Sequence, residues 1–124
     1  METEKERMLR GGLYNAEDPA LAQERVRAKE ICWQINHLPI SEEAQRNGLL
    51  VQLLGSTDGA FTILPDFWCD YGSNIHIGKN FFANHGLVVL DGAPVTIGDN
   101  VFVAPNVGLY TAGHPLDVRK RNRY

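Results

Sequence analysis

The sequence is poor in cysteine, in basic charge and in long apolar runs. Two cysteines among 124 residues are too few for a disulfide-stabilised secreted scaffold. Twelve basic and fifteen acidic residues leave a net charge of -3, which argues against nucleic-acid binding because that needs a basic field. No run of about 18 apolar residues occurs, so neither a transmembrane helix nor a membrane partner is predicted. The charged start METEKER has no apolar signal-peptide core, and we therefore expect a cytoplasmic protein.

The two cysteines are not expected to carry chemistry. Cys32 falls in a predicted helix and Cys69 in a predicted strand. A disulfide between them is not expected, because cytosolic thiols stay reduced. Cys69 is not expected to act as a nucleophile, since no neighbour in the sequence would lower its pKa.

Helical patterns fill the first part of the chain. Glycines at helix ends, an Asp-Pro start and leucines at spacings of three and four mark three helices. The predicted helices are Thr3 to Arg10, closed by Gly11; Asp18-Pro19 to about His37; and Ser41 to Leu54, closed by Gly55. We expect them to form a helical cap domain over residues 1–58, packed by its leucines and with no further role implied by the pattern.

Short strand-and-turn units replace the helical pattern from residue 59 on, and one unit occurs twice. The segment IHIGKNFFAN at 75–84 recurs as VTIGDNVFVA at 95–104, twenty residues later. Such repetition indicates a solenoid, in which each unit buries its apolar side only by stacking on the next. Three six-residue units and about two further residues would make one coil of twenty. The predicted fold is therefore mainly β, with about three coils in residues 59–124.

Individual residues of the units have predicted places in the coil. We expect four aliphatic side chains to point into the coil: Ile77, Ile97, Val103 and Val107. Three asparagines are expected at corners, where the turn needs a residue that tolerates a left-handed backbone: Asn80, Asn100 and Asn106. Two further strands are predicted before the repeats, at Phe61 to Leu64 and at Phe67 to Gly72.

Longer motifs connect these repeats with a known family. They are MLRGGLY at 8–14, RVRAK at 25–29, CDYGSNI at 69–75, NFFAN at 80–84, IGDNV at 97–101, APNV at 104–107 and TAGHP at 111–115. With them the sequence resembles the maltose and galactoside O-acetyltransferases of the hexapeptide-repeat superfamily over essentially its whole length. The resemblance implies a left-handed parallel β-helix behind a small helical domain, assembled as a homotrimer with active sites between subunits. Members of that family continue for several more coils, so we expect this β-helix domain to be incomplete at its C-terminal end.

The resemblance also implies a reaction. The family transfers acetyl from acetyl-CoA to a hydroxyl of a sugar such as maltose, glucose or a galactoside, without a metal. His114 matches the family's general base, and histidine suits this role because its pKa lies near working pH. From spacing alone, His114 could equally be a turn residue on a solvated loop. Gly113 and Pro115 would hold its loop in a tight turn.

Three other residues match family positions at the site. Asn84 matches a residue that faces the active site from the adjoining subunit, and its amide could bind an acceptor hydroxyl or the thioester oxygen of acetyl-CoA. Asp70 matches an acceptor-contacting position, and Phe82 matches an aromatic residue at the sugar site. Each also has a structural alternative: a corner turn for Asn84, a strand-end cap for Asp70 and coil packing for Phe82.

Two further acidic positions are weaker candidates. Asp91 lies at a turn where the family carries acids, but here the next residue is Gly92. Some members bind the acceptor with an acid near the position of Ala16, and Asp18 is the nearest acid in this chain. The identity of the acceptor sugar is therefore left open.

Two alternative functions are kept open. The chain could be a trimeric β-helix protein that is truncated and inactive, because a missing wall of the donor site removes the orientation on which rate depends. It could instead bind zinc through His76, His85 and His114, like carbonic anhydrases with a left-handed β-helix. The basic segment 119–123 could attract the phosphates of coenzyme A, or simply form a solvated loop.

Overall fold

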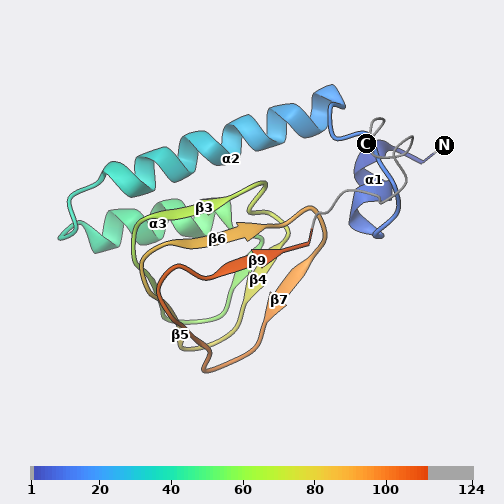
Figure 1. Cartoon of the computed structure of the whole chain (residues 1–124). Coiled ribbons are helices and arrows are strands. Elements are labelled where there is room, and N and C mark those ends of the chain that lie inside the picture. Colours follow the sequence, from blue (N-terminus) through green and yellow to red (C-terminus); the bar gives the residue numbers. More distant parts are fainter. Residues whose placement is uncertain (1, 112–124) are drawn as a thin grey trace.

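The computed structural model describes residues 2–111 and contains three helices followed by the coils of a parallel β-helix (Figure 1). The helices are α1 (Glu4–Leu9), α2 (Pro19–His37) and α3 (Glu43–Leu53). The strands are β1 (Ser56–Thr57), β2 (Phe61–Ile63), β3 (Phe67–Cys69), β4 (Ile75–Ile77), β5 (Phe81–Ala83), β6 (Leu87–Leu90), β7 (Val95–Ile97), β8 (Phe102–Val103) and β9 (Gly108–Tyr110). No helix in this part of the chain is long and apolar enough to cross a bilayer.

The first two helices begin as the sequence predicts. Thr3 forms a capping box with Glu6 at the start of α1, and Gly11 follows that helix with a φ of 81°. Asp18 caps α2 by accepting hydrogen bonds from two backbone N–H groups of the first turn. The third helix begins later than predicted, at Glu43 and not at Ser41. The N–H of Glu42 donates to the carbonyl of Pro39 (2.9 Å), so Ser41 belongs to the preceding turn.

Each coil contributes one strand to each of three parallel sheets (Figure 1). The strand orders are β1-β4-β7, β2-β5-β8 and β3-β6-β9 within the described residues. Strand partners are twenty residues apart throughout, as Trp68, Val88 and Gly108 illustrate. The twenty-residue coil and the stack of three coils predicted from the repeated segment are therefore confirmed. The first coil begins with β1, just before residue 58, where the boundary of the cap was predicted.

The coil corners and the core follow from the residues at fixed positions of the repeat. All three predicted corner asparagines have left-handed backbones, with φ of 56° at Asn80, 60° at Asn100 and 59° at Asn106. The side chains of Asn80 and Asn100 are also hydrogen-bonded to each other (3.0 Å), which links two coils at one corner. Ile77 and Val103 are buried inside the coils, whereas the side chains of Ile97 and Val107 in the last described coil are half-buried.

The predicted strand from Phe67 to Gly72 is shorter in the structure, because the chain turns after Cys69. The buried carboxylate of Asp91, from the next coil, accepts hydrogen bonds from the N–H groups of Tyr71 (2.9 Å) and Asn74 (3.3 Å). These donors therefore bond to a side chain at the corner and not to a neighbouring strand.

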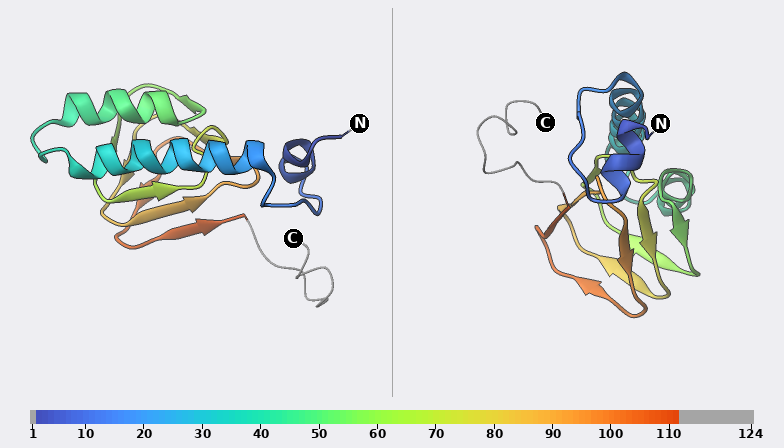
Figure 2. Two further views of the ribbon diagram at one scale, coloured as in Figure 1. Left: turned by 90° about the horizontal axis from the view of Figure 1, so that it is seen from above. Right: turned by 90° about the vertical axis from the view of Figure 1, so that its right-hand side faces the viewer.

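One edge of β3 pairs with no strand of the described chain, and α2 covers that edge; Figure 2 shows the helix lying along the strand. Three residues at helical spacing on one face of α2 reach the strand. Asn36 binds the backbone of Phe67, Lys29 donates to the carbonyl of Cys69 (2.6 Å), and the sulfur of Cys32 lies 3.8 Å from that of Cys69. The helix thus satisfies backbone groups that an exposed edge strand would present to water or to other chains.

Candidate functional site

The predicted site residues that the structure describes lie at two places on the β-helix. Asp70 directly follows β3, whereas Phe82 and Asn84 lie on β5 and just after it. Since Asn84 precedes β6, which pairs with β3, Asp70 and Asn84 lie at opposite ends of the strands of one sheet. A single chain therefore does not bring Asp70 and Asn84 together. His114 and the basic segment 119–123 lie outside the described residues.

Asp70 is held by the helical cap. Its Oδ1 lies 3.3 Å from Nζ of Lys29, and both side chains are partly exposed. Its other carboxylate oxygen has no hydrogen-bond partner among residues 2–111 and can accept from a ligand hydroxyl. The carboxylate thus anchors the corner after β3 to α2 and still presents an acceptor at the surface.

A polar cluster beside Asp70 joins the segment after α1 to the first coil. Arg25 donates to the hydroxyl of Tyr71 (2.8 Å) and to the carbonyl of Ala16 (2.7 Å). Burial raises the pKa of Tyr71 and of Tyr14, and the charge of Asp70 adds to both shifts. The two phenols therefore stay protonated and can donate hydrogen bonds. Ala16, the position for which the resemblance implied an acceptor-binding acid in some relatives, is thus close to this cluster.

Sequence reasoning did not predict this cluster around Asp70. Arg25 and Tyr14 lie in the motifs RVRAK and MLRGGLY, so those motifs were the available signal. In the folded chain Arg25 contacts Tyr71, which is 46 residues away in the sequence. Local patterns carry no information about such a contact.

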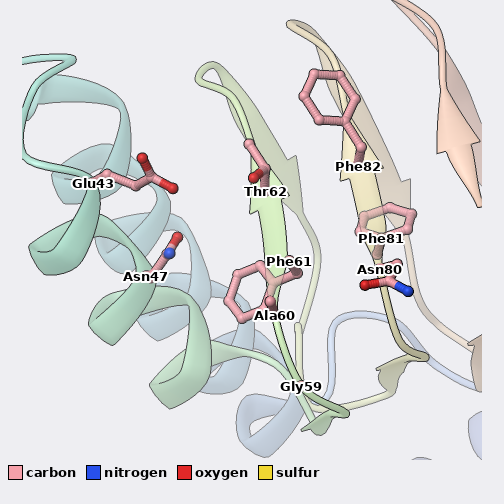
Figure 3. A pocket seen from close by; sticks show the side chains of 9 residues that line it. All are labelled: Glu43, Asn47, Gly59, Ala60, Phe61, Thr62, Asn80, Phe81 and Phe82. Atoms are coloured by element: carbon pink, nitrogen blue, oxygen red, sulfur yellow. The ribbon is translucent and has the colours of Figure 1, made fainter. Parts of the chain in front are cut away.

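Phe82 belongs to a stacked pair of aromatic rings on the outer face of β5 and β8. Its ring is nearly parallel to that of Phe102, with centroids 5.0 Å apart and an interplanar angle of 8°. Phe82 also lines an open depression of about 470 Å³ between this face and α3 (Figure 3). The predicted packing role and the predicted ligand-facing role of Phe82 are therefore compatible, because it packs on one neighbour and lines an open space.

Asn84 follows Phe82 by two residues, so the two side chains are on the same face of the strand segment. Its Oδ1 accepts a hydrogen bond from the N–H of His85 (2.8 Å), which is the turn role weighed as an alternative. Its Nδ2 has no partner among residues 2–111 and can donate to an oxygen of a ligand. Because Oδ1 is bound to the N–H of His85, the amide group is held in one orientation and Nδ2 points away from the turn.

Asp91 is a structural residue. It is fully buried and binds backbone N–H groups at the corner after β3, and its own carbonyl accepts from Nδ2 of Asn74 (2.8 Å). Burial raises the pKa of Asp91, although the backbone hydrogen bonds act in the opposite direction. The carboxylate is therefore enclosed by its own corner and does not face a ligand.

The other titratable candidates lie apart from one another. His76 Nδ1 is 2.8 Å from Oγ of Ser56 on the β1-β4-β7 sheet, and His85 Nδ1 contacts the carbonyl of Pro65 at another corner. In residues 2–111, no three His, Cys, Asp or Glu side chains are grouped so that they could hold a metal ion. The thiol of Cys69 is buried, and its contact with Cys32 and then burial raise its pKa, which does not suit a nucleophile.

Comparison with known proteins connects this arrangement with a family. Residues 7–59 match the maltose acetyltransferase hexapeptide capping motif. A putative acetyltransferase of Saccharomyces cerevisiae is 53% identical over 94% of this chain and 60% of its own length. This chain thus spans about three fifths of the length of that relative.

Two solved structures share the fold. A maltose O-acetyltransferase from Clostridium difficile 630 superposes with a TM-score of 0.94 at 45% identity, covering 98% of this chain and 65% of that one. A galactoside acetyltransferase in complex with coenzyme A superposes with a TM-score of 0.92 at 37% identity, covering 98% of this chain and 61% of that one. The predicted left-handed parallel β-helix behind a small helical domain is confirmed. Over the part that it spans, the chain is similar in sequence and fold to the maltose and galactoside O-acetyltransferases of the hexapeptide-repeat proteins.

Proposed function

We propose that this protein transfers an acetyl group from acetyl-CoA to a hydroxyl of a sugar such as maltose, glucose or a galactoside. The observation that carries the proposal is the likeness, at a TM-score of 0.92, to a galactoside acetyltransferase solved with coenzyme A. The matched segment covers the helical cap, and the superposition extends over the described coils. Fold alone does not fix function, so the proposal is tied to particular residues.

The reaction needs a base for the acceptor hydroxyl. The sugar oxygen attacks the carbonyl carbon of the thioester, the carbon–sulfur bond breaks, and the thiol of coenzyme A leaves. In this proposal His114 takes the proton of the hydroxyl during the attack and returns a proton to the departing thiolate. No acyl-enzyme is formed. His114 matches the family's base in the motif TAGHP, and an imidazole has a pKa suited to both transfers.

The described site residues take binding roles in this scheme. The Nδ2 of Asn84, which has no partner among residues 2–111, donates to the acceptor or to the thioester oxygen, where negative charge develops during the attack. The outer oxygen of Asp70 accepts from a sugar hydroxyl, and the ring of Phe82 contacts an apolar face of the sugar. The turn contact at Asn84 and the ion pair at Asp70 support these roles, because they hold the two side chains in fixed directions.

We also propose a homotrimer with sites shared between subunits. The separation of Asp70 and Asn84 along one sheet supports this, because a second subunit could complete a site that one chain leaves open. Exposed aromatic side chains on the outer faces of the coils, Phe102 and Tyr110, are typical of surfaces that pack against a partner.

An acetylation assay tests the activity. The chain is incubated with acetyl-CoA and a panel of mono- and disaccharides, and release of the coenzyme A thiol is followed together with the acetylated sugar. The proposal predicts transfer to at least one sugar and loss of that transfer in His114→Ala, by about 100-fold or more. A variant as fast as the wild type would exclude His114 as the base. No transfer by the wild type would favour the inactive alternative for this chain.

A further inference from the structure

The depression beside Phe82 has two chemically different walls (Figure 3). One wall is the outer face of β2 and β5, and the other is α3. Its lining includes Phe82 and Thr62 from the strands and Glu43 and Asn47 from the helix. The volume of about 470 Å³ is within the range of small-ligand sites.

The strand wall is a row of side chains that changes from aromatic to small. Thr62, Phe82 and Phe102 are strand partners in successive coils and point to the same face. Phe82 and Phe102 form the stacked pair, but the row ends at Thr62, whose side chain is too short to cover Phe82. The side of Phe82 toward β2 therefore borders open space, and that space is the depression.

The helix wall supplies hydrogen-bonding groups with no partners in the described chain. Glu43 and Asn47 are one helical turn apart, so both side chains reach the same region of surface. Within residues 2–111 neither side chain has a hydrogen bond or an ion pair. A carboxylate accepts, an amide both donates and accepts, and the hydroxyl of Thr62 does both. Neighbouring hydroxyl groups of a ring would match this set.

The depression shares one side chain, that of Phe82, with the candidate acceptor site. Phe82 lines the depression, and Asn84 follows it on the same face of the same strand segment. Asn84 does not itself line the depression, whose strand-side residues are 59–62 and 80–82, so a ligand held at Asn84 would reach the depression by extending past Phe82.

We propose that this depression binds a second sugar ring of the acceptor. This rests on the proposed function. The apolar C–H face of a pyranose lies against Phe82, and its ring hydroxyls bind Glu43 and Asn47, while the ring to be acetylated lies at Asn84. The acceptor class is accordingly a disaccharide or longer glycoside, and Glu43 and Asn47 set the preference for it over a monosaccharide.

Direct binding of maltose and glucose to the 124-residue chain tests the proposal without requiring transfer. Dissociation constants are measured by NMR or calorimetric titration. Maltose should bind more tightly than glucose, and Glu43→Ala and Asn47→Ala should each weaken maltose binding roughly fivefold to tenfold with little effect on glucose. Glu42→Ala is the matched control, because Glu42 is the adjacent carboxylate, is exposed and does not line the depression. It should bind both sugars like the wild type.

Three results would overturn the subsite: equal affinity for the two sugars, no measurable binding of maltose, or maltose binding unchanged in both variants. The acetylation assay distinguishes failure of the subsite from failure of the proposed transferase function. If the chain acetylates glucose but the variants keep the wild-type ratio of rates on maltose and glucose, the subsite is wrong and the transferase stands. If the variants lose maltose affinity but no form transfers acetyl, the subsite stands and the transferase does not.

Discussion

Asn36 on α2 binds both backbone polar groups of Phe67 on β3. Its Nδ2 donates to the carbonyl (3.0 Å), and its Oδ1 accepts from the N–H (2.9 Å). The amide side chain thus takes the place that a neighbouring strand would occupy, at an edge of β3 that no strand in residues 2–111 pairs. This pairing explains how the helical cap is fixed to the first coil.

Asn36→Ala should destabilise the chain by about 2–4 kcal/mol. The substitution removes two hydrogen bonds and leaves the backbone of the buried Phe67 unmatched, and this loss outweighs the better helix propensity of alanine. Urea unfolding measures the free energy. Gln34→Ala, at an exposed position of the same helix, is the control and should change stability by less than about 0.5 kcal/mol. Equal losses in the two variants would mean that Asn36 does not fix the cap.

Gly72→Ala should cost far more stability than Gly11→Ala, although both glycines have a left-handed backbone, with φ of 78° and 81°. The strained backbone costs each variant about 1 kcal/mol. A Cβ at Gly11 would meet nothing within 4 Å, whereas at Gly72 it would lie 2.6 Å from the side chain and 2.7 Å from the carbonyl of Leu53. Gly72→Ala should therefore lose roughly 2 kcal/mol more. Thermal unfolding of the two variants measures the difference, and similar melting temperatures would contradict the close approach of α3 to this corner.

Asp91 should make stability depend on pH in a definite direction. Burial raises the pKa of this carboxyl in the folded chain above its ordinary value of 3.8. The folded chain then holds the proton more tightly than the unfolded chain, so the contribution of Asp91 to stability is greatest below about 3.8 and falls as the pH rises through the folded-state pKa.

Asp91→Asn removes this titration and gives the comparison. Wild-type stability minus variant stability, from urea unfolding at several pH values, should be largest at acid pH and shrink toward neutral pH. The variant should also be less stable overall by about 1–3 kcal/mol. In the wild type one carboxylate oxygen accepts from the N–H of Tyr71 and the other from that of Asn74, whereas asparagine has one oxygen and turns an NH2 group toward one of these donors. A difference that grows with pH would show that the hydrogen bonds outweigh burial.

The repeated segment was sufficient to predict the coils, because a parallel β-helix imposes its period directly on the sequence. The spacing of Ile77 and Ile97 gave the twenty-residue register, and the corner asparagines followed from their tolerance of a left-handed backbone. The start of α3 was predicted too early because the turn at Glu42 depends on one backbone hydrogen bond that side-chain pattern does not reveal.

The contacts between cap and coils could not be predicted in the same way. Asn36 and Phe67 are 31 residues apart, and Lys29 and Asp70 are 41 apart, in segments with different periodicity. The burial of Asp91 was equally hidden, since an acid before Gly92 reads as an exposed turn. Glu43 and Asn47 were not among the predicted site residues because only the folded cap brings α3 beside Phe82. Asp70, Phe82 and Asn84 were identified by family resemblance, and their ligand-binding roles, like that of His114, remain predictions.

Acetyl transfer by a mixture of two inactive variants tests the shared transferase site most directly. Asn84→Ala and His114→Ala chains are each assayed alone and then after unfolding and refolding together, with acetyl-CoA and a sugar that the wild type uses. If one subunit supplies Asn84 and its neighbour supplies His114, random mixed trimers should regain about a quarter of wild-type activity. A mixture no more active than its two components, or a wild-type chain that transfers no acetyl group, would contradict the account.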